Sequence, residues 1–458
     1  MIGVLKKRVQ LRGVPGEPKE AVEPVSSAYK KLLLILLMVI LAFTNADRVA
    51  FSVVLQALKV DLHLSDTQLG ILMGTAFFAS YAMLGIPIAR WADRGNRARI
   101  LTIFTLLSSV LLALCGRATS FVQLLLLRVG LGAGESGCIP TSNSLISDYF
   151  ARAERPRALA IYGLGWPLSS LCGFSVVGWV SQHYGWRLMF FIIALPGIVL
   201  SVLSGILIRE PRAIASGIGV SQDEPQDASD PCPSLREVIS TLLRSKTFVS
   251  LFKQYCTLSF VGYAVLLWTP SFLVRSYGLS PAQVGYWMAL THGLLGMVGT
   301  YVGGFLSSRY LPQRERAQFL IMMGLYAALA LLLATLFAGP PIQFVVVMGA
   351  LAALFGSMVN GPLIASWVTL VPPRMRAMAV AILFLGSNLV GACFGPLAIG
   401  AISDALQPHF RAESLRYTML IFSAGYLWPA YYLWRASQTV ERDLAALKVT
   451  HSESGLLA

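Results

Sequence analysis

Two residues of opposite charge lie in a stretch of sequence that otherwise has the composition of a membrane span. In the segment RVGLGAGESG, residues 128–137, Arg128 and Glu135 are seven residues apart, with glycine at every second position from Gly130 to Gly134. Seven residues is nearly two turns of an α-helix, so both side chains lie on one face. Charges exposed to lipid at this depth cost several kilocalories per mole. We therefore expect both side chains to face a partner or a water-filled cavity.

A second charged pair, Asp47 and Arg48, lies in the first apolar segment. Counted from the end that the charge pattern makes cytoplasmic, Asp47 and Arg48 are roughly 22–24 Å deep, Glu135 roughly 20 Å and Arg128 roughly 30 Å. Neighbouring helix residues point about 100° apart, so Asp47 and Arg48 are expected to have different partners.

Two interpretations of these four charges stay open. They either form a structural cluster of ion pairs that joins two helices, or they form a proton-coupled anion site. In the second case Glu135, and after it Asp47, takes up a proton, and Arg48 or Arg128 then binds an anionic substrate.

The elements that hold these residues follow from composition. Of 458 residues, 56% are hydrophobic and only 13% are charged, and the mean hydropathy is +0.67. We predict an all-α integral membrane protein with twelve transmembrane helices in two six-helix bundles. The apolar segments are residues 32–54, 68–91, 100–117, 119–147, 156–180, 187–208, 247–272, 282–307, 317–337, 341–370, 376–402 and 416–435.

The formal net charge of +14 is explained by topology. Most lysine and arginine residues lie in alternate loops and near both ends of the chain, which makes those loops and both termini cytoplasmic. We therefore expect a multi-pass protein of a bacterial inner membrane, with no nucleic-acid partner. The six cysteines are scattered singly, and the sequence has no nucleophile elbow, phosphate-binding loop or metal-ligand cluster. We expect neither an enzyme nor a cofactor or metal site.

The chain is an internal repeat. The segment LSDTQLGILM (64–73) returns as LSPAQVGYWM (279–288), and RALAIYGLG (157–165) is echoed by RAMAVAILF (376–384). An even number of spans per half makes this a parallel repeat. The predicted parts are a tail (1–30), a first bundle (31–208), a cytoplasmic linker (209–246), a second bundle (247–436) and a flexible tail (437–458).

One basic loop carries a family resemblance. In GIPIARWADRGNRAR, residues 85–99, Asp93, Arg94 and Arg97 match the signature loop of the major facilitator superfamily, which this segment resembles. Asn96 stands where that loop usually has glycine, and Ala89 replaces an earlier glycine. The resemblance implies a secondary transporter that works by alternating access.

Three further segments look like the spinster-type branch of that superfamily: NADR (45–48), GAGESG (132–137) and LISDYFARAERPRALAIYGLGWPLSS (145–170). This resemblance implies an amphiphilic anionic substrate, such as a lysophospholipid or a sphingoid phosphate. An anion:proton symporter branch shares Asp-Arg in the first span and Arg plus Glu in the fourth, so a small organic acid is the alternative. A membrane sensor of the same fold that transports nothing is a third possibility.

Several uncharged residues complete the candidate substrate site. His292, Asn360 and Asn388 form a polar layer in the second half, opposite the charges, although each alone is more often a helix-to-helix hydrogen bond. The aromatic residues Tyr81, Trp166, Tyr263 and Trp268 are candidates for the wall of an apolar cavity that would hold the substrate's tail. The expected partners are this substrate, protons and membrane lipids, and the protein is expected to act as a monomer.

The signature loop is expected to act as a gate. Asp93 would lie against the positive end of the helix that begins near Arg376, and its neighbour Arg94 belongs to the same gating loop. Arg97 would pair with Glu154 or Asp148. Breaking these contacts would open the cytoplasmic side.

Overall fold

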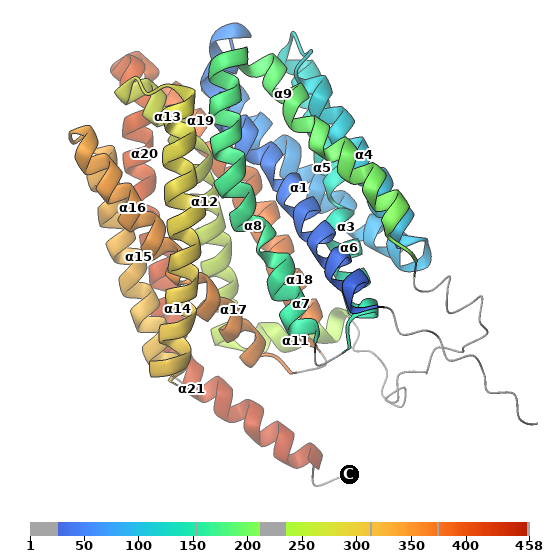
Figure 1. Ribbon diagram of the computed structural model, residues 1–458. Coiled ribbons are helices and arrows are strands. Elements are labelled where there is room, and N and C mark those ends of the chain that lie inside the picture. Colours follow the sequence, from blue (N-terminus) through green and yellow to red (C-terminus); the bar gives the residue numbers. More distant parts are fainter. Residues whose placement is uncertain (1–25, 152–153, 211–234, 312–313, 373–374, 456–458) are drawn as a thin grey trace, which may run out of the picture.

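The computed structural model describes residues 26–151, 154–210, 235–311, 314–372 and 375–455, and these residues form an all-helical bundle (Figure 1). The side chains of a few more residues inside the helices, Asp93 and Arg94 among them, lie outside this description. The predicted all-α membrane fold is confirmed.

The first half contains nine α-helices and two π-helical turns among its described residues. They are α1 (Ser27–Asp61), α2 (Asp66–Gly70), η1 (Ile71–Thr75), α3 (Ala76–Arg94), α4 (Arg97–Cys115), α5 (Phe121–Glu135), α6 (Cys138–Tyr149), α7 (Arg155–Gly163), α8 (Gly165–Leu168), η2 (Ser169–Gly173) and α9 (Phe174–Leu207).

A short helix, α11 (Leu235–Arg244), precedes the second half. The described elements that follow are α12 (Lys246–Tyr277), α13 (Pro281–Met288), η3 (Ala289–Leu295), α14 (Gly296–Tyr310), α15 (Glu315–Phe337), α16 (Ile342–Met358), α17 (Asn360–Thr369), α18 (Arg376–Gly386), η5 (Ser387–Ala392), α19 (Cys393–Phe410), η6 (Arg411–Glu413), α20 (Ser414–Ala424) and α21 (Leu427–Gly455).

Ten continuous helical stretches in the described part of the chain are long and apolar enough to cross a membrane. Two of them, Arg155–Leu207 and Met378–Ala445, are 53 and 68 residues long and therefore long enough for two crossings each. The first is interrupted at Gly185 (φ 77°) and the second at Arg411 (φ 47°). With these two interruptions, the stretches account for the twelve predicted crossings.

The internal repeat is visible in local structure. Ser65 and Ser280 each begin a helix with a capping box, completed by Gln68 and Gln283 three residues later. The π-helical turns repeat as well: from residue 71 to residue 289, and from residue 169 to residue 387, the offset is 218 residues. Such turns mark places where a helix departs from regular geometry, often near functional sites.

The two halves are joined at one end of the bundle. This end carries Asp61, Asp66, Tyr277 and Phe410 and is called the Asp66 end (top in Figure 1); the basic loops lie at the opposite, Arg97 end. On the Asp66 side, hydrogen bonds and ion pairs connect the halves, among them one from Thr75 Oγ1 to the carbonyl of Cys393 (3.0 Å). Helices approach closely there, because a Cβ on Gly70 or Gly74 would lie 2.6 Å from a carbonyl oxygen of α19.

Two predicted segments differ from expectation. The linker, predicted over residues 209–246, includes the ten-residue helix α11, while its middle, 211–234, lies outside the described residues. The predicted flexible tail continues α21 to Gly455, and α21 extends beyond the bundle (Figure 1). The stretch ERDLAALK contains strong helix formers and no glycine or proline. Asp443 also packs back on α12, where it accepts hydrogen bonds from Ser245 Oγ and the Thr247 amide.

Candidate functional site

The four charges of the first half form two crossed ion pairs. Arg128 Nη1 donates to Asp47 Oδ2 at 2.7 Å, and Arg48 Nη2 donates to Glu135 Oε2 at 3.3 Å. Asp47, Arg128 and Glu135 have exposed fractions of 1–2%, whereas the Arg48 side chain is 12% exposed. The adjacent residues Asp47 and Arg48 thus have different partners, in keeping with the 100° between neighbouring helix positions.

The local sequence of α5 lets these charges come together. A Cβ on Gly132 would lie 2.2 Å from the carbonyl oxygen of Phe77 on α3, and one on Gly134 would lie 2.7 Å from Ser108 Oγ on α4. The alternating glycines therefore allow two helices to pack against α5. The helix ends at Glu135, and α6 begins at Cys138. Pro140, which cannot donate to the carbonyl of Ser136, accounts for this break.

Arg128 is held on several sides. Besides its bond to Asp47, Arg128 Nε donates to the carbonyl of Leu72 at 3.0 Å, and the guanidinium lies 4.1 Å from the ring centre of Phe51. The guanidinium is thus held by an ion pair, a backbone carbonyl and a ring face, which are the contacts of a structural residue.

Arg48 is less fully engaged. Its Nη1 donates to Asn45 Oδ1 at 3.2 Å, but its buried Nε has no hydrogen-bond partner in the protein. The guanidinium lies within 6.0 Å of four aromatic ring centres, those of Phe77, Phe78, Tyr81 and Trp166. A buried arginine with an unused donor retains capacity to bind an anion.

The two carboxyl groups are neighbours as well. Each pairs with one of the two arginines of the cluster, and Asp47 Oδ1 accepts no hydrogen bond from the described protein. A proton bound by either carboxyl group would alter the balance of two positive and two negative charges at this cluster.

The second half contains a cavity of about 350 Å³. Three of the candidate residues, Tyr263, His292 and Asn360, line it, and most of its other walls are aliphatic or aromatic. The indole N–H of Trp287, which also lines the cavity, has no hydrogen-bond partner in the described protein. The cavity is therefore mainly apolar, with a few polar groups, which is typical of small-molecule sites.

Aromatic rings connect the charged cluster to this cavity. The ring of Phe78 lies 5.3 Å from the Arg48 guanidinium and packs edge-on against Tyr263, also at 5.3 Å. Tyr81 and Trp166, in contrast, lie beside Arg48 in the first half and do not line the cavity of the second half.

Two further candidates do not line this cavity either. Asn388 lies in the π-helical turn η5 and is not among the lining residues. Trp268 is fully buried, and its Nε1 donates to the carbonyl of Pro396 at 3.0 Å, so it is a packing residue between α12 and α19.

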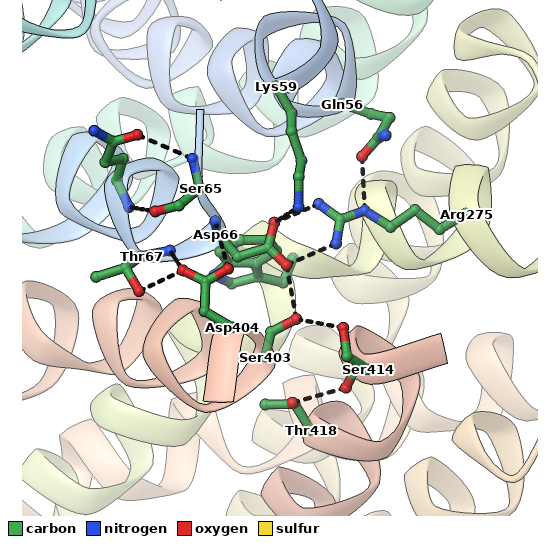
Figure 2. Close-up of polar contacts among 12 residues, drawn as sticks. Gln56, Lys59, Ser65, Asp66, Thr67, Arg275, Ser403, Asp404, Ser414 and Thr418 are labelled. Atoms are coloured by element: carbon green, nitrogen blue, oxygen red, sulfur yellow. Dashed lines mark hydrogen bonds and ion pairs between the residues drawn. The ribbon is translucent and has the colours of Figure 1, made fainter. Parts of the chain in front are cut away.

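A second polar cluster closes the Asp66 end (Figure 2). The Asp66 carboxylate, 1% exposed, binds Arg275 through both oxygens (2.7 and 2.8 Å) and accepts from Ser403 Oγ at 2.7 Å. Lys59 also donates to Asp66, at 2.6 Å. Since Arg275 and Ser403 belong to the second half, this carboxylate holds the halves together.

Asp404 strengthens the same cluster from the second half. Its carboxylate accepts from the backbone N–H groups of Asp66 (3.0 Å) and Thr67 (2.7 Å) and from Thr67 Oγ1 (2.6 Å). It therefore caps the N-terminus of the opposite half's helix. Sequence reasoning missed Asp66, Arg275 and Asp404 as a set. The available signal was a lone aspartate in the capping box and a lone arginine near the end of a span, both predicted to lie at the same membrane surface.

At the Arg97 end, Arg97 pairs with Asp148, one of its two predicted partners, and also with Glu210, which was not predicted. Arg97 is fully buried and binds Glu210 and Asp148, each at 2.6 Å. Glu154 does not reach Arg97, because Glu210 and Asp148 already occupy that guanidinium, and pairs instead with Lys30 at 3.6 Å. All of these contacts lie within the first half. The predicted contact of Asp93 with the helix near Arg376, and the role of Arg94, fall on side chains outside the described residues.

The Arg97 pair also shifts the acidity of Glu210, which lies just beyond α9. Burial of this carboxyl group alone would raise its pKa, but the hydrogen bonds and charge of Arg97, together with the Arg97 and Ala98 amides, lower the pKa below the ordinary value. Glu210 therefore stays ionised and bound near neutral pH.

Comparison with known proteins supports this picture. Residues 34–336 match the Major Facilitator Superfamily. An MFS-type efflux pump of Mycolicibacterium smegmatis is 30% identical over 403 residues, 87% of this chain and 90% of that protein. A hexuronate transporter of Bacillus subtilis is 25% identical over 279 residues, covering 60% of this chain and 64% of that protein. The solved structure of a bacterial homologue of the human lysosomal transporter spinster, inward-facing and unoccupied, has a TM-score of 0.79 at 27% identity and covers 92% of this chain and 99% of that one.

Proposed function

The chain belongs to the Major Facilitator Superfamily and is a multi-pass membrane transporter, not an enzyme; within that family we propose that it is a proton-coupled carrier of an amphiphilic anion. The substrate class is that of a lysophospholipid or a sphingoid phosphate. The observation that carries this proposal is the Arg48 guanidinium, which has an unused N–H and lies beside an aromatic wall that leads to an apolar cavity.

The proposed orientation follows from the basic loops at the Arg97 end, which the positive-inside rule makes cytoplasmic. The Asp66 end is then external, and its closed ion-pair cluster corresponds to a carrier that is shut on the outside. The spinster homologue of similar fold is itself inward-facing, which supports the same state for this chain.

The anionic head of the substrate is proposed to bind Arg48 rather than Arg128. Arg48 is the more exposed of the two arginines, and its pairing with Glu135 is longer, 3.3 Å against 2.7 Å for Arg128 with Asp47. A phosphate would replace Glu135 as the partner of Arg48 and form a charge-assisted pair.

The hydrophobic tail is proposed to lie in the cavity of the second half. At about 350 Å³, it is near the lower end of the range for ligand sites, which is roughly 300–1,000 Å³. Phe78 and Tyr263, which pack between Arg48 and this cavity, are the rings that a bound substrate would contact with its middle part.

Proton coupling is proposed to occur at Glu135, with Asp47 as a second carboxyl group that shares the proton. Protonation of Glu135 removes the negative partner of Arg48, so the anion and the proton favour each other's binding. Both carboxyl groups pair with arginines of one cluster, and Asp47 Oδ1 accepts no hydrogen bond from the described protein, which supports a shared proton.

The test uses a cavity-filling variant. Ala353 is buried and lines the cavity, whereas Ala327 on α15 is exposed. We expect Ala353→Phe to weaken binding of a lysophospholipid at least tenfold in a thermal-shift titration, while Ala327→Phe binds like wild type. Unchanged lysophospholipid binding by a folded Ala353→Phe would refute the proposed tail site.

The alternative substrate is a small organic acid anion, which the hexuronate transporter among the relatives favours. Such a substrate would need Arg48 but not the apolar cavity. Stabilisation of the wild type by glucuronate and not by the lysophospholipid would select this alternative.

A further inference from the structure

A second cavity, of about 280 Å³, lies at the Arg97 end between α11, α12 and α21. Its lining includes three basic side chains, Lys246 and Lys253 of α12 and Arg435 of α21. Lys246 and Lys253 are seven residues apart and so share one face of α12, roughly 10 Å apart along its axis. None of these residues takes part in the substrate site or in the contacts between the halves.

The three cations have little compensation from the protein. All three side chains are exposed, and the described residues provide no ion pair for them. The nearby carboxylate of Asp443 accepts from Ser245 Oγ and from the amide of Thr247, so it caps α12. Three like charges around one hollow repel each other, and the site therefore favours an anion.

Exposed apolar and aromatic side chains surround this cavity. On α11, Val238 and Leu242 are buried against the protein, whereas Ile239 and Leu243 are 40% and 67% exposed. On α21, Tyr431 and Trp434 next to Arg435 are 49% and 46% exposed. An amphipathic helix with an outward apolar edge, flanked by exposed aromatic side chains, is typical of a segment that lies at the bilayer interface.

We propose that this cavity binds the headgroup of an anionic phospholipid from the cytoplasmic leaflet. The phosphodiester would lie among Lys246, Lys253 and Arg435, with the Tyr432 hydroxyl as a further donor. The acyl chains would run along the exposed apolar side chains of α11 and α21. Free phosphate could satisfy the same charges, but it would leave those apolar side chains without a partner.

The bound lipid would join three segments. It would connect the end of the linker, through α11, to the first helix of the second half and to the long α21. This site is independent of the substrate site proposed above, because no residue lines both cavities.

The test is a titration of purified full-length protein in detergent. The probes are dioleoyl phosphatidylglycerol, dioleoyl phosphatidylcholine and inorganic phosphate, and the readouts are bound lipid by native mass spectrometry and the melting temperature. We compare the wild type, Lys246→Gln/Lys253→Gln/Arg435→Gln and the single variant Lys253→Gln. The matched control, Lys31→Gln/Arg99→Gln/Arg316→Gln, removes three exposed basic residues elsewhere.

We expect the triple variant to bind phosphatidylglycerol at least tenfold more weakly, Lys253→Gln to be intermediate, and the control to match the wild type. The proposal would be overturned if the wild type, Lys253→Gln and the triple variant all bound phosphatidylglycerol equally well. Binding of phosphatidylcholine as tight as that of phosphatidylglycerol would also overturn the proposal, because it would show that charge plays no role. Stabilisation by inorganic phosphate equal to that by phosphatidylglycerol would overturn it too, because it would assign the site to a free anion.

Discussion

Removal of one buried carboxylate charge should release the closed Asp66 end. In Asp66→Asn, the side chain keeps its size but can no longer accept both guanidinium hydrogen bonds of Arg275. The hydrogen bond from Lys59 does not hold the two halves together, because Lys59 and Asp66 belong to the same half.

The expected magnitude follows from the lost contact between the halves. A hydrogen bond to a charged group contributes roughly 1.5–3 kcal/mol. Because Asp66 is only 1% exposed, screening by solvent reduces this contribution only slightly. Loss of about one such bond shifts the ratio of closed to open states by roughly 10- to 150-fold.

The assay is a distance measurement between spin labels across the Asp66 end. Val60 of the first half and His409 of the second are both exposed and suit labelling in a chain whose native cysteines are replaced. We expect Asp66→Asn to add a longer-distance population that the wild type lacks.

A matched control is available at the same end. Asp61 pairs with Arg187 and accepts from Trp186 Nε1 at 3.1 Å, and all three residues belong to the first half. Asp61→Asn should therefore leave the distances unchanged. If the distance distributions of Asp66→Asn and the wild type coincide, the Asp66 cluster does not hold the two halves closed.

Three other predictions separate structural from functional roles. Arg48→Gln should weaken binding of an anionic substrate by roughly 1.5–3 kcal/mol and leave folding intact. Arg128→Gln leaves the buried Asp47 carboxylate without its charged partner and should therefore lower the stability of the fold by roughly 3–5 kcal/mol. Ligand titration and melting curves distinguish the two variants, and equal effects would contradict the assignment. Because the pKa of Glu210 is lowered in the folded state, its contribution to stability is complete above the ordinary pKa of 4.5 and is lost as pH falls below that value. The melting temperature of the wild type should therefore fall more steeply than that of Glu210→Gln as pH falls from about 5 to about 3; parallel curves would rule this out. Gly132→Ala should destabilise the protein by about 1–3 kcal/mol, because its Cβ would lie 2.2 Å from the Phe77 carbonyl oxygen. Gly163→Ala should be tolerated, because Gly163 has open space around it. Equal melting temperatures of the two variants would contradict this prediction.

The sequence could predict the charged cluster because its signal is local. Charged residues are rare in apolar segments, so Asp47, Arg48, Arg128 and Glu135 stood out, and helix geometry placed them at similar depths. The repeat was visible for the same reason, since two capping-box segments recur at the same distance from a basic loop.

Long-range partners could not be predicted in this way. Asp66 and Arg275 are 209 residues apart and meet only when the two halves close at one end. Glu210 lies 113 residues from Arg97 and pairs with it beside the predicted partner Asp148, while the other predicted partner, Glu154, binds Lys30 instead. Pairings of this kind depend on how whole helices pack, which a single sequence does not specify.

The central claim is that protonation of Glu135 drives transport by releasing Arg48. The most direct measurement is uptake of a labelled lysophospholipid into vesicles reconstituted with wild type or Glu135→Gln, with and without an imposed pH gradient. The account predicts that wild type accumulates substrate only with the gradient, while Glu135→Gln, whose amide mimics the protonated carboxyl group, still exchanges substrate but does not respond to the gradient. Accumulation by Glu135→Gln in response to the gradient, equal to that of wild type, would contradict it.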